Sequence, residues 1–261
     1  MDINNYLLTA KSKLENKTIK TLILSIYAGI FIAIAGLLST IVSLTIDNYS
    51  ISKILSGIVF PIGLILVILF KTELFTGNSL LIIPLLEKKT TIKKVLKNWI
   101  IVYLGNLIGI LIITFLVYNT PLKDKISESL INIANTKLSY TFIEAMILGI
   151  LCNFLVTSAV YLSTLAKTIT EKIIVIFIPI FTFIVLSLEH SIANMYYLSF
   201  GYLLDNTIAI KEILLNNLLP VTLGNIIGGL FLGISLSYLK EKNKLEQKFE
   251  LIFYNLIPLV N

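Results

Sequence analysis

Long runs without charge constrain this chain more than any other feature of its sequence. A bilayer core of about 30 Å needs roughly 20 helical residues at a rise of 1.5 Å per residue. Four stretches without Asp, Glu or Lys reach that length, at residues 21–46, 98–122, 145–166 and 213–239. Two more apolar regions are long enough to span, but ionisable residues interrupt each near its middle, at residues 54–86 and 173–204. The sequence therefore predicts an all-α membrane protein with six transmembrane helices.

The composition supports this and argues against a nucleic-acid partner. The chain of 261 residues is 56% hydrophobic and 14% charged, whereas soluble domains carry about 25% charged residues. All 21 basic residues are lysines, and they lie in short clusters between the apolar runs. A net charge of +6 arranged in this way indicates contact with membrane lipid. The single cysteine, Cys152, excludes an internal disulfide.

The two halves of the chain share a sequence motif. Leu-Gly-Asn-Leu-Ile-Gly at residues 104–109 matches Leu-Gly-Asn-Ile-Ile-Gly at residues 223–228, an offset of 119. Small residues at such positions let neighbouring membrane helices approach closely. We expect these glycines and asparagines to serve helix packing.

The interruptions of the second and fifth apolar regions also match. Glu73 and Asn78 bracket the first, and Glu189 and Asn194 bracket the second, 116 residues later. Three spans per half is an odd number, so the halves should enter the membrane from opposite sides as inverted repeats, at about residues 21–120 and 138–240. Broken helices at matching places in inverted repeats indicate a substrate path.

The distribution of lysines predicts the orientation. With the N-terminus inside, the cytoplasmic segments hold 15 lysines and the outer segments hold five. The positive-inside rule then places both termini in the cytoplasm, in a multi-pass protein of the cytoplasmic membrane. Residues 1–20, with apolar side chains among lysines, are expected to form an interfacial helix. Residues 21–240 are expected to form the six-span transmembrane domain, and residues 241–261 a cytoplasmic tail.

The breaks contain the candidate functional side chains. His190, the only histidine, falls at the second break near mid-membrane, where an ionisable group is by default a functional hypothesis. Imidazole donates protons near neutral pH, which suits the passage of a weak acid. The alternative is a neutral histidine bonded between helices. Glu189 beside it is expected to satisfy freed amides or to orient a neighbouring group.

The first break offers Thr76, a small hydroxyl donor next to Gly77. If the two breaks meet, Thr76 lies opposite His190; otherwise its hydroxyl bonds to its own helix. Lys137, just before the fourth span, is either an attractor of anions or an ordinary surface lysine. The broken spans also contain four larger apolar side chains, which either form constrictions or simply pack. They are Phe60, Leu64, Phe75 and Phe183.

Several chemistries leave no trace in the sequence. No second histidine is available for an HExxH metal site, and neither a glycine-flanked catalytic serine nor a Walker loop is present. We therefore expect no catalytic residues, no metal, no cofactor and no enzyme activity. A channel or passive transporter remains.

Four separated motifs resemble those of the formate/nitrite transporter family. They are Glu-Leu-Phe-Thr-Gly-Asn at residues 73–78, Thr-Phe-Ile-Glu-Ala at 141–145, Leu-Glu-His-Ser-Ile-Ala-Asn-Met at 188–195, and residues 220–229. The resemblance implies an aquaporin-like protomer assembled as a homopentamer, with one anion pathway per protomer and lipid on the central axis. It assigns Thr76 and His190 to the two breaks, Lys137 to the vestibule and Asn153 to the fourth span. It also places the constrictions at the four large side chains just named.

One residue departs from the family pattern. Lys71 lies where a small uncharged residue is expected, and it should pair with Glu73 or with a neighbouring subunit.

The sequence favours passage of a small monovalent weak acid. A bare carboxylate in an apolar constriction carries a large desolvation cost, so we expect the anion to be protonated at the Thr76–His190 site, by His190 or by water. The resemblance makes formate the first candidate, because formate is the commonest assignment in that family, with nitrite or hydrosulfide as alternatives. An aquaporin-like channel for neutral solutes is disfavoured because neither break contains Asn-Pro-Ala.

Overall fold

The computed structural model describes residues 3–256, and the side chains of residues 3–240. Within that part of the chain every regular element is a helix, as the apolar runs predict. Five stretches are long and apolar enough to cross a membrane: Thr18–Ser43, Tyr49–Leu69, Ile92–Tyr118, Phe142–Leu165 and Ile210–Lys240. The remaining predicted span is divided into α10 (Ile169–Val185) and α11 (Ser191–Leu204), of 17 and 14 residues.

The first half contains the interruption that the sequence predicts. Helix α2 (Thr18–Ser43) is followed by α3 (Tyr49–Val59) and α4 (Ile62–Leu69), which are separated at Pro61. The chain then leaves the helix, and Lys71 adopts a positive φ of 54°. Short elements resume the path, and a long helix completes the half: α5 (Phe75–Asn78), η1 (Ser79–Leu81), α6 (Ile82–Leu86) and α7 (Ile92–Tyr118).

The second half repeats this pattern. Helix α9 (Phe142–Leu165) starts with a capping box between Thr141 and Glu144, and α10 carries Pro179 within it. Ser187 has the same positive φ as Lys71, 116 residues earlier. Three elements end the described chain: α12 (Ile210–Glu212), the π-helical turn η2 (Ile213–Leu218) and α13 (Leu219–Leu256).

Glycines hold the long helices close together, as the shared motif predicts. On α7, a Cβ at Gly109 would lie 2.0 Å from the carbonyl oxygen of Ile26 on α2. On α13, a Cβ at Gly228 would lie 2.2 Å from the carbonyl oxygen of Ile150 on α9. Each half is therefore built around one pair of helices whose backbones touch.

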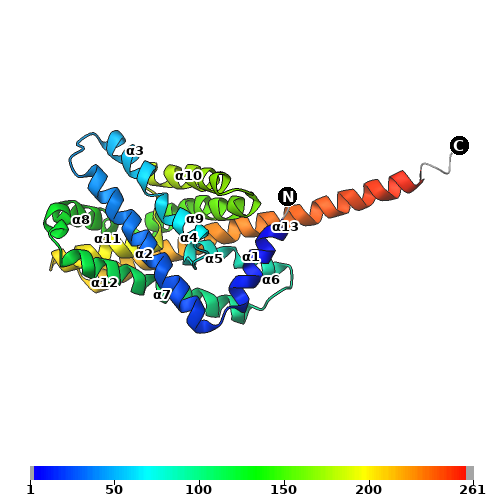
Figure 1. Cartoon of the computed structure of the whole chain (residues 1–261), viewed down its shortest axis with the longest axis horizontal. Helices are drawn as coiled ribbons and strands as arrows, with labels where there is room; N and C mark the ends of the chain where they lie inside the picture. Colours follow the sequence, from blue (N-terminus) through cyan, green and yellow to red (C-terminus); the bar gives the residue numbers. More distant parts are fainter. Residues whose placement is uncertain (1–2, 257–261) are drawn as a thin grey trace.

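Two further helices lie at opposite ends of the helical body, α1 (Asn4–Glu15) and α8 (Leu122–Leu138) (Figure 1). Sequence reasoning missed α8. Its signal was Ile126, Leu130 and Ala134, which recur every four residues and are fully buried.

Helix α1 lies in the segment that the sequence assigns to an interfacial helix. Its side chains Tyr6, Leu7 and Ala10 are buried, and the helix contacts α6, α7 and α9. The apolar face expected to meet lipid is thus covered by protein, while Leu8 remains 71% exposed. A location at the membrane interface stays a prediction.

The helix ends do not coincide with the predicted bounds of the transmembrane domain, residues 21–240, and those bounds stay a prediction. Helix α2 starts at Thr18 rather than at residue 21, since long lysine side chains can extend from a helix end to water. The predicted tail starts inside α13, which continues to Leu256 and projects away from the helical body (Figure 1). Residues 1–2 and 257–261 of the predicted terminal segments lie outside the described residues.

Candidate functional site

Thr76 and His190 lie together in the interior, as expected if the two breaks meet. The Oγ1 of Thr76 on α5 is 3.0 Å from the Nε2 of His190, at the N-terminal cap of α11. Thr76 is fully buried and His190 is 3% exposed. A hydroxyl from one half of the chain thus contacts an imidazole from the other.

The position of His190 determines which ring nitrogen carries its proton. The amide N–H of Ala193 donates to Nδ1 at 3.1 Å, so Nδ1 is an acceptor. In the neutral ring the proton is then on Nε2, which faces the Thr76 hydroxyl. If both ring nitrogens of His190 were protonated, the Nδ1–H would face the N–H of Ala193. Two donors would then oppose each other with no acceptor between them.

The broken backbone of the first half is held by Asn106 on α7. Its Oδ1 accepts from the amide of Phe75 at 2.9 Å, and its Nδ2 donates to the carbonyls of Ser25 at 2.8 Å and Glu73 at 2.9 Å. These bonds satisfy backbone groups that the break frees.

Asn225 on α13 does the same for the second half. Its Oδ1 accepts from the amide of Ser191 at 2.8 Å, and its Nδ2 donates to the carbonyls of Gly149 at 2.8 Å and Glu189 at 3.0 Å. Sequence reasoning assigned both asparagines only to helix packing. Their identical place in the repeated motif was the signal for this second role.

Glu189 is enclosed by donors. Lys137 on α8 donates to its Oε1 at 2.8 Å, and Asn194 and Asn217 donate to its Oε2 at 2.5 Å and 3.2 Å. The side chains of Lys137 and Glu189 are 13% and 2% exposed. Lys137 is therefore not an isolated surface lysine, and together with the two side-chain amides it holds the carboxylate of the residue that precedes His190.

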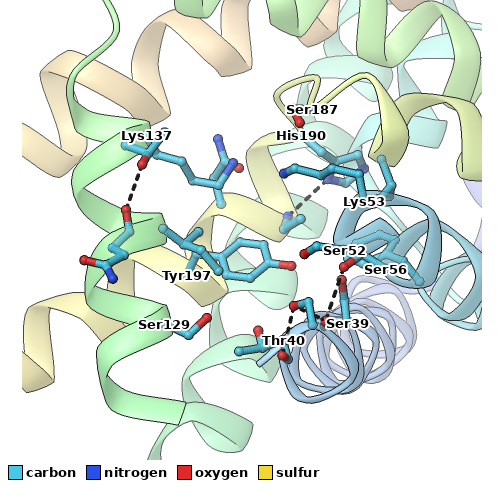
Figure 2. Close-up of a pocket in the computed structure, with 18 of the residues that line it drawn as sticks. Ser39, Thr40, Ser52, Lys53, Ser56, Ser129, Lys137, Ser187, His190 and Tyr197 are labelled. Atoms are coloured by element: carbon cyan, nitrogen blue, oxygen red, sulfur yellow. Dashed lines mark hydrogen bonds between the residues drawn. The ribbon is translucent and has the colours of Figure 1, made fainter. Parts of the chain in front are cut away.

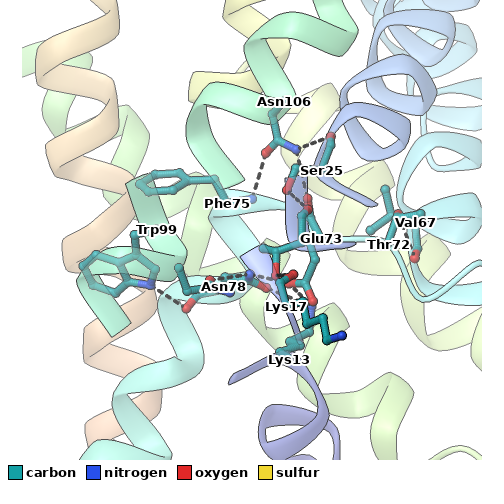
Figure 3. A network of polar contacts seen from close by, with 12 residues as sticks. Lys13, Lys17, Ser25, Val67, Thr72, Glu73, Phe75, Asn78, Trp99 and Asn106 are labelled. Atoms are coloured by element: carbon teal, nitrogen blue, oxygen red, sulfur yellow. Dashed lines mark hydrogen bonds and ion pairs between the residues drawn. The ribbon is translucent and has the colours of Figure 1, made fainter. Parts of the chain in front are cut away.

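A matching network surrounds Glu73 (Figure 3). Lys13 on α1 donates to the Oε2 of Glu73 at 3.0 Å, and Asn78 donates to the same oxygen at 2.6 Å. Asn78 also donates to the Oδ1 of Asn98 at 2.9 Å. Sequence reasoning missed Lys13, and the suggested pair of Glu73 with Lys71 is wrong. Lys71 has an exposed side chain, on a turn with left-handed backbone.

A cavity of about 850 Å³, here called the vestibule, is lined by side chains of α3, α8 and α10 among others (Figure 2). Phe60, Phe183 and His190 are among its lining residues. The rings of Phe60 and Phe183 meet edge-on at 5.6 Å, and Phe183 stacks on His190 at 5.9 Å. Burial, with a smaller effect from the charge of Glu189, raises the pKa of Tyr140, so this lining phenol is neutral at pH 7.

The other predicted site residues are buried and are not among those that line the vestibule. Asn153 on α9 donates to the carbonyl of Thr76 at 3.2 Å and to the hydroxyl of Ser79 at 3.0 Å. Leu64 is buried on α4. The Phe75 ring packs edge-on against Trp99 and Tyr103 of α7, and a constriction role for Leu64 and Phe75 stays a prediction.

Comparison with known proteins gives the family. The family described as formate/nitrite transporter matches residues 2–239. The chain belongs to the formate/nitrite transporter family. It is thus a membrane protein from a family of channels and transporters.

Individual relatives agree with this assignment. A probable formate transporter of Methanothermobacter thermautotrophicus is 35% identical over 85% of this chain and 90% of its own length. A structure titled "Pentameric formate channel with formate bound" matches with a TM-score of 0.75 at 31% identity, covering 85% of this chain and 97% of that one. A second structure, titled "FNT family ion channel", matches with a TM-score of 0.83 at 25% identity, covering 91% and 99%.

Proposed function

We propose that this protein is a channel or passive transporter that carries a small monovalent weak-acid anion across the cytoplasmic membrane. Formate is the first candidate, because relatives are named for it. Nitrite and hydrosulfide are alternatives of similar size and charge. The observation that carries the proposal is the buried Thr76–His190 pair behind the vestibule.

The proposal includes an arrangement in the membrane. Helices α10 and α11 together form the fifth of six spans, in two inverted repeats with both termini in the cytoplasm. The matching networks around Glu73 and Glu189 support the repeat. A homopentamer is supported by a similar structure whose title calls it pentameric.

Desolvation decides the form in which the substrate crosses. Moving an ionised carboxylate past the buried rings of Phe60 and Phe183 costs far more than thermal energy. A simple carboxylic acid with a pKa of about 3–4 is neutral for only about one part in a thousand or less at pH 7. The anion must therefore be protonated before it passes the rings.

His190 acts in this scheme as a neutral hydrogen-bond donor. Its Nδ1 is occupied by the Ala193 amide, so Nε2–H is the group that meets a substrate oxygen next to Thr76. The proton that neutralises the anion then comes with the substrate from water. Asn153 fixes the Thr76 backbone at the same point.

Flux into proteoliposomes tests the proposal. Uptake of formate, nitrite and hydrosulfide is measured at about pH 5.5 and about pH 7.5. Between these pH values the neutral fraction of formic acid and of nitrous acid changes about 100-fold. Variants are His190→Asn, which removes the Nε2 donor, and Lys211→Gln, an exposed control on α12. Protein-free vesicles measure passive leakage.

We expect formate uptake to rise at the lower pH in the wild type and in Lys211→Gln, and to fall at least tenfold in His190→Asn. The proposal would be contradicted if the uptake of all three anions were the same at both pH values and the same in His190→Asn as in the wild type. Faster uptake of nitrite or hydrosulfide would keep the mechanism and change the substrate.

A further inference from the structure

The vestibule contains an excess positive charge. Its charged lining side chains are Lys53, Lys125, Lys137, Glu128 and Glu189. Lys137 is neutralised by Glu189, 2.8 Å away. Lys125 and Glu128 lie about one turn apart on α8, so their opposite charges largely cancel at a distance. Lys53 on α3 is the cation that remains.

The surroundings of Lys53 hold it without neutralising it. Its Nζ lies 5.4 Å from the ring centre of Tyr49, a contact that orients an ammonium but leaves its charge in place. The Tyr49 hydroxyl is 3.0 Å from the hydroxyl of Ser187, which also lines the vestibule. Among the ion pairs of the described side chains, none includes Lys53.

A paired charge and an unpaired charge act differently on an approaching anion. The field of a close ion pair falls off rapidly because its two charges cancel. A single cation in a concave, low-dielectric wall raises the local anion concentration and the rate of entry. Lys53 and Lys137 reach the vestibule from different helices, α3 and α8 (Figure 2).

We propose that Lys53, and not Lys137, is the side chain that draws the anion into the vestibule. Lys137 instead holds Glu189, and through it the backbone next to His190. This inference rests on the proposed function, since it names the residue that recruits the substrate of the same site. It assigns the two lysines different roles that separate experiments can measure.

The test is a charge series at position 53 in proteoliposomes that present the vestibule to the added formate. The variants are Lys53→Arg, Lys53→Gln and Lys53→Glu, with Lys211→Gln as the matched control outside the vestibule. Initial uptake is measured at low salt and again near 0.5 M salt, where the Debye length is only about 4 Å. Thermal unfolding in detergent checks that each variant is folded.

We expect uptake at low salt to stay near wild type in Lys53→Arg and to fall about threefold to tenfold in Lys53→Gln, because one charge supplies only part of the about 10-fold to 1,000-fold effect that the field of a whole protein has on association rates. Lys53→Glu should fall further, and all variants should approach one another at high salt. If the glutamine variant does not fold, the arginine and glutamate variants still give the comparison.

Two results would overturn the inference and are distinguishable. If the wild type carries formate and the uptake of Lys53→Gln and Lys53→Glu equals it at low salt, Lys53 does not recruit the anion while the proposed function stands. If the wild type carries none of the three anions, both the proposed function and the role of Lys53 are wrong.

Discussion

At the scale of single residues, each break contains a buried carboxylate that is paired with a lysine and with side-chain amides. Glu189 is 2% exposed and takes bonds from one ammonium and two amides. Glu73 is 1% exposed and takes bonds from Lys13 and Asn78. A buried carboxylate that lost its cation would remain charged without compensation, which is strongly unfavourable.

The Lys137–Glu189 pair gives a prediction about stability. Lys137→Gln should destabilise the protein by about 3–5 kcal/mol, because it leaves Glu189 buried and unpaired. Adding Glu189→Gln should recover much of this loss by removing the charge itself. Thermal unfolding in detergent measures both. Equal stability of Lys137→Gln and the wild type would show that the pair does not hold the second break.

At the scale of the elements, the long helices of each half pack backbone against backbone at their glycines. A membrane provides little hydrophobic drive for helix association, so close packing has to supply it. The pairs α2–α7 and α9–α13 meet at glycines whose missing Cβ atoms would overlap a backbone carbonyl. Neither helix of a pair can yield locally, since its backbone is already fixed in helical hydrogen bonds.

Alanine at these glycines should therefore push the helices apart. We expect Gly109→Ala and its repeat counterpart Gly228→Ala each to cost about 1–3 kcal/mol, typical of overpacking. Gly57→Ala is the matched control, because a Cβ there would meet only side chains, of Phe181 and Val185, at 3.0 Å or more. Thermal unfolding of detergent-solubilised protein measures the three. A control as unstable as Gly109→Ala would contradict the explanation.

At the scale of the whole molecule, a repeated scaffold carries a site that is not repeated. Glu73 and Asn78 match Glu189 and Asn194, but the position matching His190 is Leu74, and the position matching Thr76 is Ile192. Each half thus contributes one polar group where the other half has an apolar one. The pair exists only because the two breaks meet.

Dependence on both halves predicts that their mutations are not additive. Thr76→Val should reduce formate flux, but it should add little to the loss caused by His190→Asn, because residues in one hydrogen-bonded pair act as a unit. Flux of the two single variants and the double variant gives the coupling. Full additivity would mean that Thr76 and His190 serve separate steps.

The sequence by itself determined the helical class and the two breaks, but it left open whether Thr76 meets His190 or bonds to its own helix. Bilayer thickness fixes how long an uncharged run must be, and the repeat relates the halves without any coordinates. Only the tertiary structure decided that Lys13 and Lys137 hold the buried carboxylates and that Lys53 stands unpaired in the vestibule. Lys13 and Glu73 are 60 positions apart, and Lys137 and Glu189 are 52. Such pairs form through the docking of α1 and α8, which depends on packing across the fold, and local sequence does not indicate which distant residue each lysine meets.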